Sequence, residues 1–248
     1  MFLFEIWGKF ASFRDPFTIS QNISLPIPPK TAVAGIMASI LGVEEYLGDD
    51  DFSDFEYSVV ALNPIRKKSF SQNYINDYTS KVQTHLNSLK KRSFEKIGGG
   101  MRDKKSPQKP INRELLLDVR YLIFVKRFRY EDTITEYLQN RVSRFPLYLG
   151  NSEFAGNFRF VPFFDAIELL NQKSIKVDSF VLEEDISNID FRNGVRYSKI
   201  SFATKLDNKR SPLAFANIIL GSSSIKLKDI SGVYKIETKN RTYHCRFI

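Results

Sequence analysis

The first 165 residues change hydrophobic period several times, and the order of those changes leaves few possible folds. Four segments show the period of two that is typical of half-buried strands, and they are residues 2–10, 55–65, 115–128 and 157–164. Two further segments place apolar side chains at helical spacing, and they are residues 31–42 and 132–142. The order strand, helix, strand, strand, helix, strand predicts an α+β fold of the ferredoxin-like, split βαβ type, with both helices on one face of an antiparallel sheet.

Residues at the helix ends support these two assignments. Thr31 is the expected N-cap of the first helix, because its hydroxyl can accept a hydrogen bond from an unpaired amide of the first turn. Gly42 is expected to supply a left-handed C-cap. In the second helix, Thr133 and Glu136 have the spacing of a capping box.

Beyond residue 165 the pattern changes to short strands separated by turns, in segments 176–182, 195–204, 223–230 and 233–248. We therefore expect two domains, a ferredoxin-like domain over residues 1–165 and a small, mostly β domain over residues 166–248. A chain of 248 residues of which 42% are hydrophobic is large enough to bury a core in this arrangement.

Residues 66–113 separate the second and third predicted strands, where this fold normally has a short turn. The segment holds 13 Lys and Arg residues and three Asp and Glu residues, an excess of ten positive charges. The whole chain has a net charge of +9, so the remaining residues sum to about −1. An insertion of this length within a hairpin is uncommon and is usually functional or disordered.

Aromatic residues are interleaved with the cations of this segment, at Phe70, Tyr74, Tyr78 and Phe94. Cations neutralise phosphates and aromatic faces stack on unpaired bases, and the combination is typical of single-strand recognition. The alternative is a solvated loop that only maintains solubility, but the excess of charge is larger than solubility requires. The segment therefore predicts a nucleic-acid partner without identifying it.

Composition disfavours several other classes of protein. The single cysteine, Cys245, excludes an intramolecular disulfide and a thiolate-built metal cluster, which indicates a reducing compartment. No apolar run approaches the roughly 20 residues needed to span a bilayer, so we expect a cytoplasmic protein with no membrane partner. The carboxylate-rich residues 48–56 lack a histidine partner, so we expect a solvated loop there and neither a metal site nor another cofactor.

Three segments within residues 1–160 carry a resemblance to one family, in the right order: FEIWGKFASFRDP, PIPPKTAVAGIMASILG and PLYLGNSEF. They resemble the CRISPR-associated RAMP proteins of family five, the subunits that cap the 5′ handle of the guide RNA in Cascade-type interference complexes. The Pro-Pro-Lys-Thr helix entry is the most specific element. The resemblance implies a ferredoxin-like RAMP domain, RRM-like in topology, followed by a smaller β domain. It also implies that residues 66–113 are the family's thumb-like arm, which lies near the guide.

The resemblance further implies a non-catalytic RNA-binding subunit of a prokaryotic type I complex in antiviral defence, present in one copy and not as a homo-oligomer. The implied partners are the guide RNA (crRNA), the backbone RAMP subunits and the large Cascade subunit, with target DNA reached through the complex. Candidate RNA-binding residues of the basic segment are Lys67, Lys68, Lys81, Lys90, Lys91, Arg92, Arg102, Lys104 and Lys105. Candidates elsewhere are Arg14, Lys30, Thr31, Arg141, Arg144, Gly150, Asn151 and Ser152.

Each group of candidates outside the basic segment has a structural alternative. Lys30 and Thr31 place a cation at the positive end of a helix dipole, which suits a phosphate, but Thr31 can also serve only as a cap. Arg14 can instead pair with Asp15. The turn at Gly150 can let backbone amides approach RNA, or it can be a simple helix-to-strand turn.

In one branch of the resembled family the subunit cleaves the guide precursor without metal, using tyrosine, lysine and histidine. His85 is preceded by Thr84, so the Lys-His pair of that branch is absent. We expect no enzymatic activity. The alternative is a metal-independent endoribonuclease that processes pre-crRNA, with His85, Tyr78 and Lys81 as the candidate catalytic residues. His244 is expected to be structural.

Overall fold

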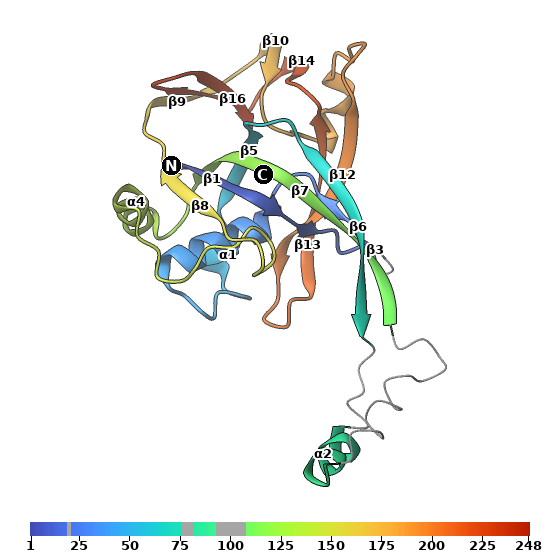
Figure 1. The fold of residues 1–248 in the computed structure, drawn as a ribbon. Helices are drawn as coiled ribbons and strands as arrows, with labels where there is room; N and C mark the ends of the chain where they lie inside the picture. Colours follow the sequence, from blue (N-terminus) through green and yellow to red (C-terminus); the bar gives the residue numbers. More distant parts are fainter. Residues whose placement is uncertain (19–20, 76–81, 93–107) are drawn as a thin grey trace.

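The fold is described by a computed structural model that covers residues 1–18, 21–75, 82–92 and 108–248. Its central sheet contains the four strands expected for the first domain, which are β1 (Phe2–Ala11), β5 (Glu56–Ala61), β7 (Gln108–Lys126) and β8 (Asn157–Phe160). These strands are antiparallel and lie in the order β5-β7-β1-β8. The connecting helices are α1 (Lys30–Leu41) and α4 (Glu131–Asn140), which contact each other (Figure 1). The α+β fold and the split βαβ order are confirmed.

One hydrophobic core lies between the sheet and the two helices. On the sheet side it contains alternate residues of β1 and β7, which are Phe2, Phe4, Ile6, Tyr121, Ile123 and Val125. On the helix side it contains Val33, Ile36, Met37, Ile40, Ile134 and Leu138. The alternating residues of β1 that predicted a half-buried strand therefore face the helices.

The opposite face of the sheet is partly covered by the last hairpin, β15 (Val233–Thr238) and β16 (Thr242–Arg246), which also pairs with β9 (Phe163–Leu169). Leu3, Leu122 and Phe124 of the sheet form a second core with Tyr243 and Phe247. The rings of Phe124 and Tyr243 lie 5.8 Å apart.

The remaining C-terminal strands form two small sheets. One pairs β10 (Gln172–Val177) with β14 (Ile225–Ile230), and the other has the order β11-β13-β12, with bounds Val181–Leu182, Pro212–Gly221 and Tyr197–Leu206. The sequence pattern missed β13. Phe180 and Phe202 of this half pack on Tyr57, with ring centroids 5.7 and 6.3 Å away, so the two halves share a core. The expected boundary at 165/166 falls inside β9, and the division into two domains stays a prediction.

Both helices begin differently from the sequence expectation. The extended Pro29, with φ of −68°, is the N-cap of α1, and its carbonyl accepts from the amides of the first turn. Thr31 is therefore a helical residue, and the cap expected there is wrong. Helix α4 begins at Glu131, so the capping box expected at Thr133 is also wrong. The left-handed C-cap at Gly42, with φ of 82°, is confirmed.

Short elements fill the connections. In the loop after β1, β2 (Phe13–Arg14) pairs with β4 (Ser24–Leu25), and β3 (Gln21–Asn22) runs parallel to β7. The 3-10 turns are η1 (Asp50–Phe52) and η3 (Glu183–Asn188). No helix of the described segments has the length and apolar character needed to cross a membrane.

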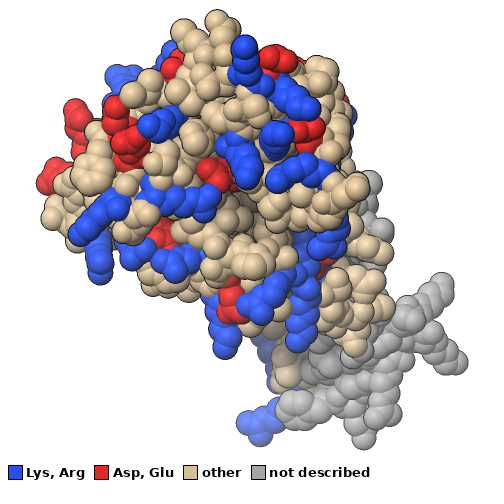
Figure 2. All heavy atoms as spheres, turned by 90° about the horizontal axis from the view of Figure 1, so that it is seen from above, with Lys and Arg blue, Asp and Glu red and all other residues tan. Residues whose placement is uncertain are grey.

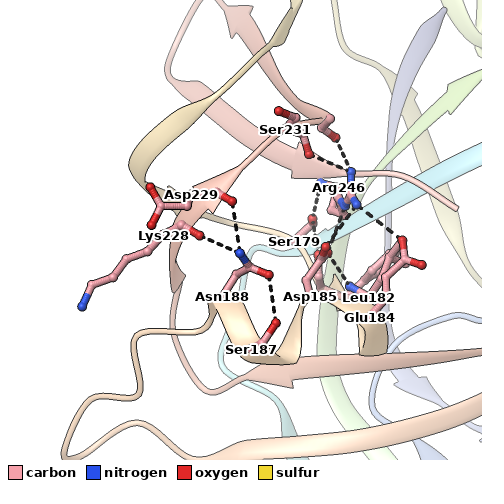
Figure 3. Close-up of polar contacts among 12 residues, drawn as sticks. Ser179, Leu182, Glu184, Asp185, Ser187, Asn188, Lys228, Asp229, Ser231 and Arg246 are labelled. Atoms are coloured by element: carbon pink, nitrogen blue, oxygen red, sulfur yellow. Dashed lines mark hydrogen bonds and ion pairs between the residues drawn. The ribbon is translucent and has the colours of Figure 1, made fainter.

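Arg246 joins three parts of the C-terminal half through its guanidinium group (Figure 3). Nε and Nη2 donate to the two carboxylate oxygens of Asp185 in η3, at 3.0 and 3.1 Å. Nη1 donates to the carbonyls of Ser231 and Gly232, at 3.1 and 3.0 Å. The Arg246 and Asp185 side chains are only 16% and 5% exposed, so solvent screens this ion pair little.

We expect Arg246→Ala to lower the free energy of unfolding by about 3 kcal/mol, because it leaves the Asp185 carboxylate buried without its partner. Chemical denaturation followed by circular dichroism measures this change. Lys199→Ala is the matched control, because it removes the exposed ion pair with Glu183 and should leave the midpoint unchanged. Equal midpoints for Arg246→Ala and the unmodified chain would contradict the structural role.

Candidate nucleic-acid interface

The basic segment continues the central sheet as a projecting ribbon. Strand β6 (Arg66–Ile75) pairs antiparallel with the first part of β7, from Arg66 opposite Leu117 to Ile75 opposite Gln108. Strand β5 pairs with the later part of the same strand, so β7 belongs to both the body and the ribbon. Figure 1 shows the ribbon leaving the body, with α2 (Val82–Lys90) beyond its end. We call residues 66–75, 82–92 and 108–117 the arm.

The ladder is irregular where the arm leaves the body. Residues 62–65 face residues 118–120, so one strand has an extra residue, as in a β-bulge. Asp118 has a φ of 48°, and its carbonyl accepts a hydrogen bond of 2.8 Å from the Asn63 side chain. Its carboxylate pairs with Arg66 at 2.5 Å. The contacts of Asp118 with Asn63 and Arg66 therefore stabilise the bulge at the point where the arm leaves the body.

Two cations at the base of the arm are bound to protein groups. The Lys67 ammonium donates to the Glu114 carboxylate at 2.7 Å and to the Ser24 carbonyl at 2.9 Å. Arg113 is 7% exposed and donates to Gln72 at 2.8 Å and to Glu153 at 3.1 Å. Lys67, a candidate for RNA binding, therefore fixes the arm to the body.

Other cations of the arm are exposed. Lys68 lies on β6, and Lys90, Lys91 and Arg92 follow one another at the end of α2. Phe70 on β6 is 37% exposed. Five candidates, Tyr78, Lys81, Arg102, Lys104 and Lys105, lie outside the described residues, and of His85 the structure describes only its place in α2.

The helix entry has a different environment. Lys30 is half-buried, and its Nζ lies 4.9 Å from the centre of the Phe55 ring. Burial lowers the pKa of Lys30, while the carboxylates of Asp54 and Glu56 act in the opposite direction. Thr31 is half-buried in the first turn of α1. Lys30 is thus packed on the body, beside acidic residues.

The turn after α4 is closed by its own backbone and packed on the first loop. The Leu149 amide donates to the Phe154 carbonyl at 2.8 Å, and the Ser12 amide donates to the Leu149 carbonyl at 3.0 Å. Gly150 has a φ of 95°, and a Cβ there would lie 1.9 Å from the Ser12 carbonyl oxygen. The need for glycine at this position is therefore explained by protein packing.

The glycine turn nevertheless lies beside the arm, because Glu153 reaches Arg113. Ser152 is exposed and Asn151 is half-exposed in this turn. Arg14 is exposed on β2, directly after the Ser12–Phe13 segment that packs on Gly150. The structure thus brings together the glycine turn, Arg14 and the base of the arm.

The two arginines before the turn differ in their contacts. Arg141 is exposed and forms the left-handed C-cap of α4, with φ of 54°. The Arg144 guanidinium lies 5.5 Å from the centre of the Tyr137 ring and donates to its hydroxyl at 2.9 Å. Arg144 therefore packs on α4.

The acidic residues 48–56 serve the fold. Asp51 pairs with Arg129 at 2.9 Å, Asp50 with Lys205 at 2.7 Å, and Glu56 with Lys126 at 2.7 Å. Phe52 and Phe55 of this segment are buried, so a fully solvated loop was the wrong expectation. Within the described ranges, no three or more His, Cys, Asp or Glu side chains are grouped as metal ligands.

His244 lies on β16 and is half-buried, and burial lowers the pKa of its imidazole. Sequence reasoning missed Arg113 at the base of the arm and Arg159 on the central sheet. Arg159 pairs with the buried Glu5, as does Arg120 of β7, and a polar residue within an alternating strand was the available signal. Figure 2 shows Lys and Arg over much of one face of the body, with Asp and Glu among them.

Comparison with known proteins gives one family and several similar folds. The family model described as CRISPR-associated protein (Cas_Cas5) matches residues 1–215. A chain of a solved structure entitled CRISPR RNA-guided surveillance complex has a TM-score of 0.52 and 16% identity, over 91% of this chain and 90% of that one. A chain of the cryo-EM structure of the Type III-B Cmr-beta complex bound to cognate target RNA and AMPPnP has a TM-score of 0.52 and 13% identity, over 90% and 86%.

No curated protein matches the chain by sequence. At the identities found, the two solved structures show a common fold. The family model covers most of the chain, in the same region as the three segments that carry the resemblance. This chain therefore belongs to the Cas5 family of CRISPR-associated proteins.

Proposed function

We propose that this chain is a non-catalytic RNA-binding subunit of a type I CRISPR surveillance complex. In this role it caps the 5′ handle of the guide RNA and joins the backbone subunits to the large subunit. The main support for the proposal is the arm, which projects from the body as a ribbon with exposed cations. The chain that bears it belongs to the Cas5 family. The likeness in fold to a chain of a CRISPR RNA-guided surveillance complex supports membership of such a complex.

The arm and the body differ in how many of their charged side chains form ion pairs within the protein. Most acidic residues of the body pair with neighbouring cations, as at Asp51, Asp190 and Asp178. By contrast, Lys68, Lys90, Lys91 and Arg92 of the arm are exposed, and their ammonium and guanidinium groups suit the phosphates of a polynucleotide. Arg14 and the turn at Asn151 and Ser152 would extend this surface from the base of the arm.

Copurification tests the proposal. A tagged copy of the chain, expressed with its neighbouring CRISPR genes and a repeat-spacer array, should retain RNA of guide length and several partner chains in one complex. Mass spectrometry and sequencing of the RNA ends identify both. Recovery of the chain without RNA and without partners would contradict the proposal.

A second candidate function is metal-independent cleavage of pre-crRNA. Most members of the family are non-catalytic, whereas some variants process the guide precursor, which is why this activity is tested. His85 belongs to α2 of the arm, and Tyr78 and Lys81 lie outside the described residues.

We expect the purified chain to leave a labelled repeat-containing precursor intact in EDTA, because Thr84 precedes His85 where the cleaving variants have a Lys-His pair. Denaturing gel electrophoresis measures the products. Specific cleavage that is lost in His85→Ala would establish the enzymatic function instead. His244→Ala serves as the histidine control.

A further inference from the structure

The uncovered part of the central sheet carries a cluster that the arm does not explain. On β1, Trp7 lies opposite Arg120 of β7 and opposite Asn157 of β8, and Glu5 lies opposite Arg159 of β8. Opposite residues of antiparallel strands hold their Cβ atoms about 5 Å apart, so these side chains are neighbours on one face. The C-terminal hairpin covers this face at Leu3, and Trp7 is about 13 Å farther along β1.

The two arginines are held in place by one buried carboxylate. The Glu5 side chain is 3% exposed, whereas Arg120 and Arg159 are 43% and 45% exposed. Arg159 donates through Nε to Glu5 Oε2 at 2.7 Å, and Arg120 donates through Nε to Glu5 Oε1. Two guanidinium groups and one carboxylate leave a net charge of +1, and both guanidinium groups remain accessible to a phosphate.

Trp7, the aromatic residue of this cluster, does not belong to a hydrophobic core. Trp7 is half-buried as a residue, and it is absent from all three hydrophobic clusters formed by the described residues. An aromatic ring on a sheet face, beside arginines, stacks on unpaired bases of single-stranded RNA. Trp7 is thus partly accessible, and the Arg120 and Arg159 guanidinium groups on the same face suit the phosphates that flank a stacked base.

We propose that Trp7, Arg120 and Arg159 form a second RNA-contact site, in which one unpaired base stacks on Trp7 and the arginines bind the adjoining phosphates. This inference rests on the proposed RNA-binding function, and it adds a site on the body to the contacts of the arm. Asn157 lies opposite Trp7 and offers an amide for the edge of the stacked base.

The single tryptophan of the chain makes the site directly measurable, because all indole emission comes from Trp7. We expect a single-stranded oligouridylate to quench this emission with saturation. In parallel, anisotropy of a labelled copy of the same RNA measures total binding. Arg120→Ala and Arg159→Ala should each lower the RNA affinity measured by quenching about tenfold, because each removes one phosphate contact. The fold should be preserved in both variants, because the remaining arginine still neutralises Glu5.

Trp7→Leu should weaken binding about tenfold by anisotropy, whereas Trp7→Phe, which keeps an aromatic face, should bind nearly as well as the unmodified chain. Arg129→Ala is the control, because it removes an exposed arginine paired with Asp51 away from this face. RNA binding by anisotropy with unchanged Trp7 emission would reject this site and leave the proposed function intact. Absence of binding in both measurements would reject the proposed function together with the site.

Discussion

Replacement of Lys90, Lys91 and Arg92 by alanine is expected to weaken RNA binding by about two orders of magnitude at roughly 50 mM salt, if each cation neutralises one phosphate. All three are exposed at the end of α2, so their loss changes no described packing contact. For single strands, the slope of log K against log salt should become shallower by about two. The difference between variant and unmodified chain should therefore shrink as salt is raised. Filter binding of guide RNA across a salt series measures both quantities.

A charge-matched control separates a local contact from a general effect of net charge. Lys173, Lys176 and Lys239 are exposed in the C-terminal half, and β10, which carries the first two, lies at the opposite end of the molecule from α2 (Figure 1). Their combined replacement by alanine removes the same three charges and should leave the slope close to that of the unmodified chain. Equal losses in the two triple variants would contradict a specific role for the arm.

Element order could be predicted from the sequence because β1, α1, β7 and α4 each bury one face, and a buried face requires a regular hydrophobic period. The long N-terminal extension of β7 could not be predicted in this way, because residues 108–114 are mostly polar and show no hydrophobic period. Their strand conformation comes from pairing with β6, a contact distant in sequence. Strand β13 was missed for a related reason: its residues Pro212–Gly221 are apolar at nearly every position, so the sequence lacks the apolar and polar alternation of a half-buried strand.

The sequence predicted the positive charge of the candidate nucleic-acid interface, but it could not predict which of its cations are bound to other protein groups. A count of Lys and Arg identifies the arm, yet it cannot distinguish Lys67, which is bound to Glu114, from the exposed Lys68 beside it. That distinction depends on Ser24 and Glu114, which the fold brings to the arm from distant parts of the chain. Likewise, the pairing of Arg120 and Arg159 on Glu5 follows from the register of three strands.

Gly150→Ala is expected to lower the free energy of unfolding by about 4 kcal/mol, the combined cost of a left-handed alanine and of a steric overlap. The added Cβ would lie 1.9 Å from the Ser12 carbonyl oxygen, which is backbone and cannot rotate away. The overlap would separate the turn from the first loop and break the hydrogen bond between the Ser12 amide and the Leu149 carbonyl. Calorimetric or chemical unfolding of the purified chain measures the loss.

Gly194→Ala measures the conformational part of that cost alone, so the difference between the two variants gives the steric part. Gly194 has a similar φ of 83°, but no atom lies within 4 Å of a Cβ added there. Its replacement should cost about 1 kcal/mol, the strain of the left-handed conformation alone. If both variants lose only this smaller amount, the turn does not pack on Ser12. Weaker guide binding by Gly150→Ala, together with this smaller loss of stability, would then make close approach of RNA the better explanation for the glycine.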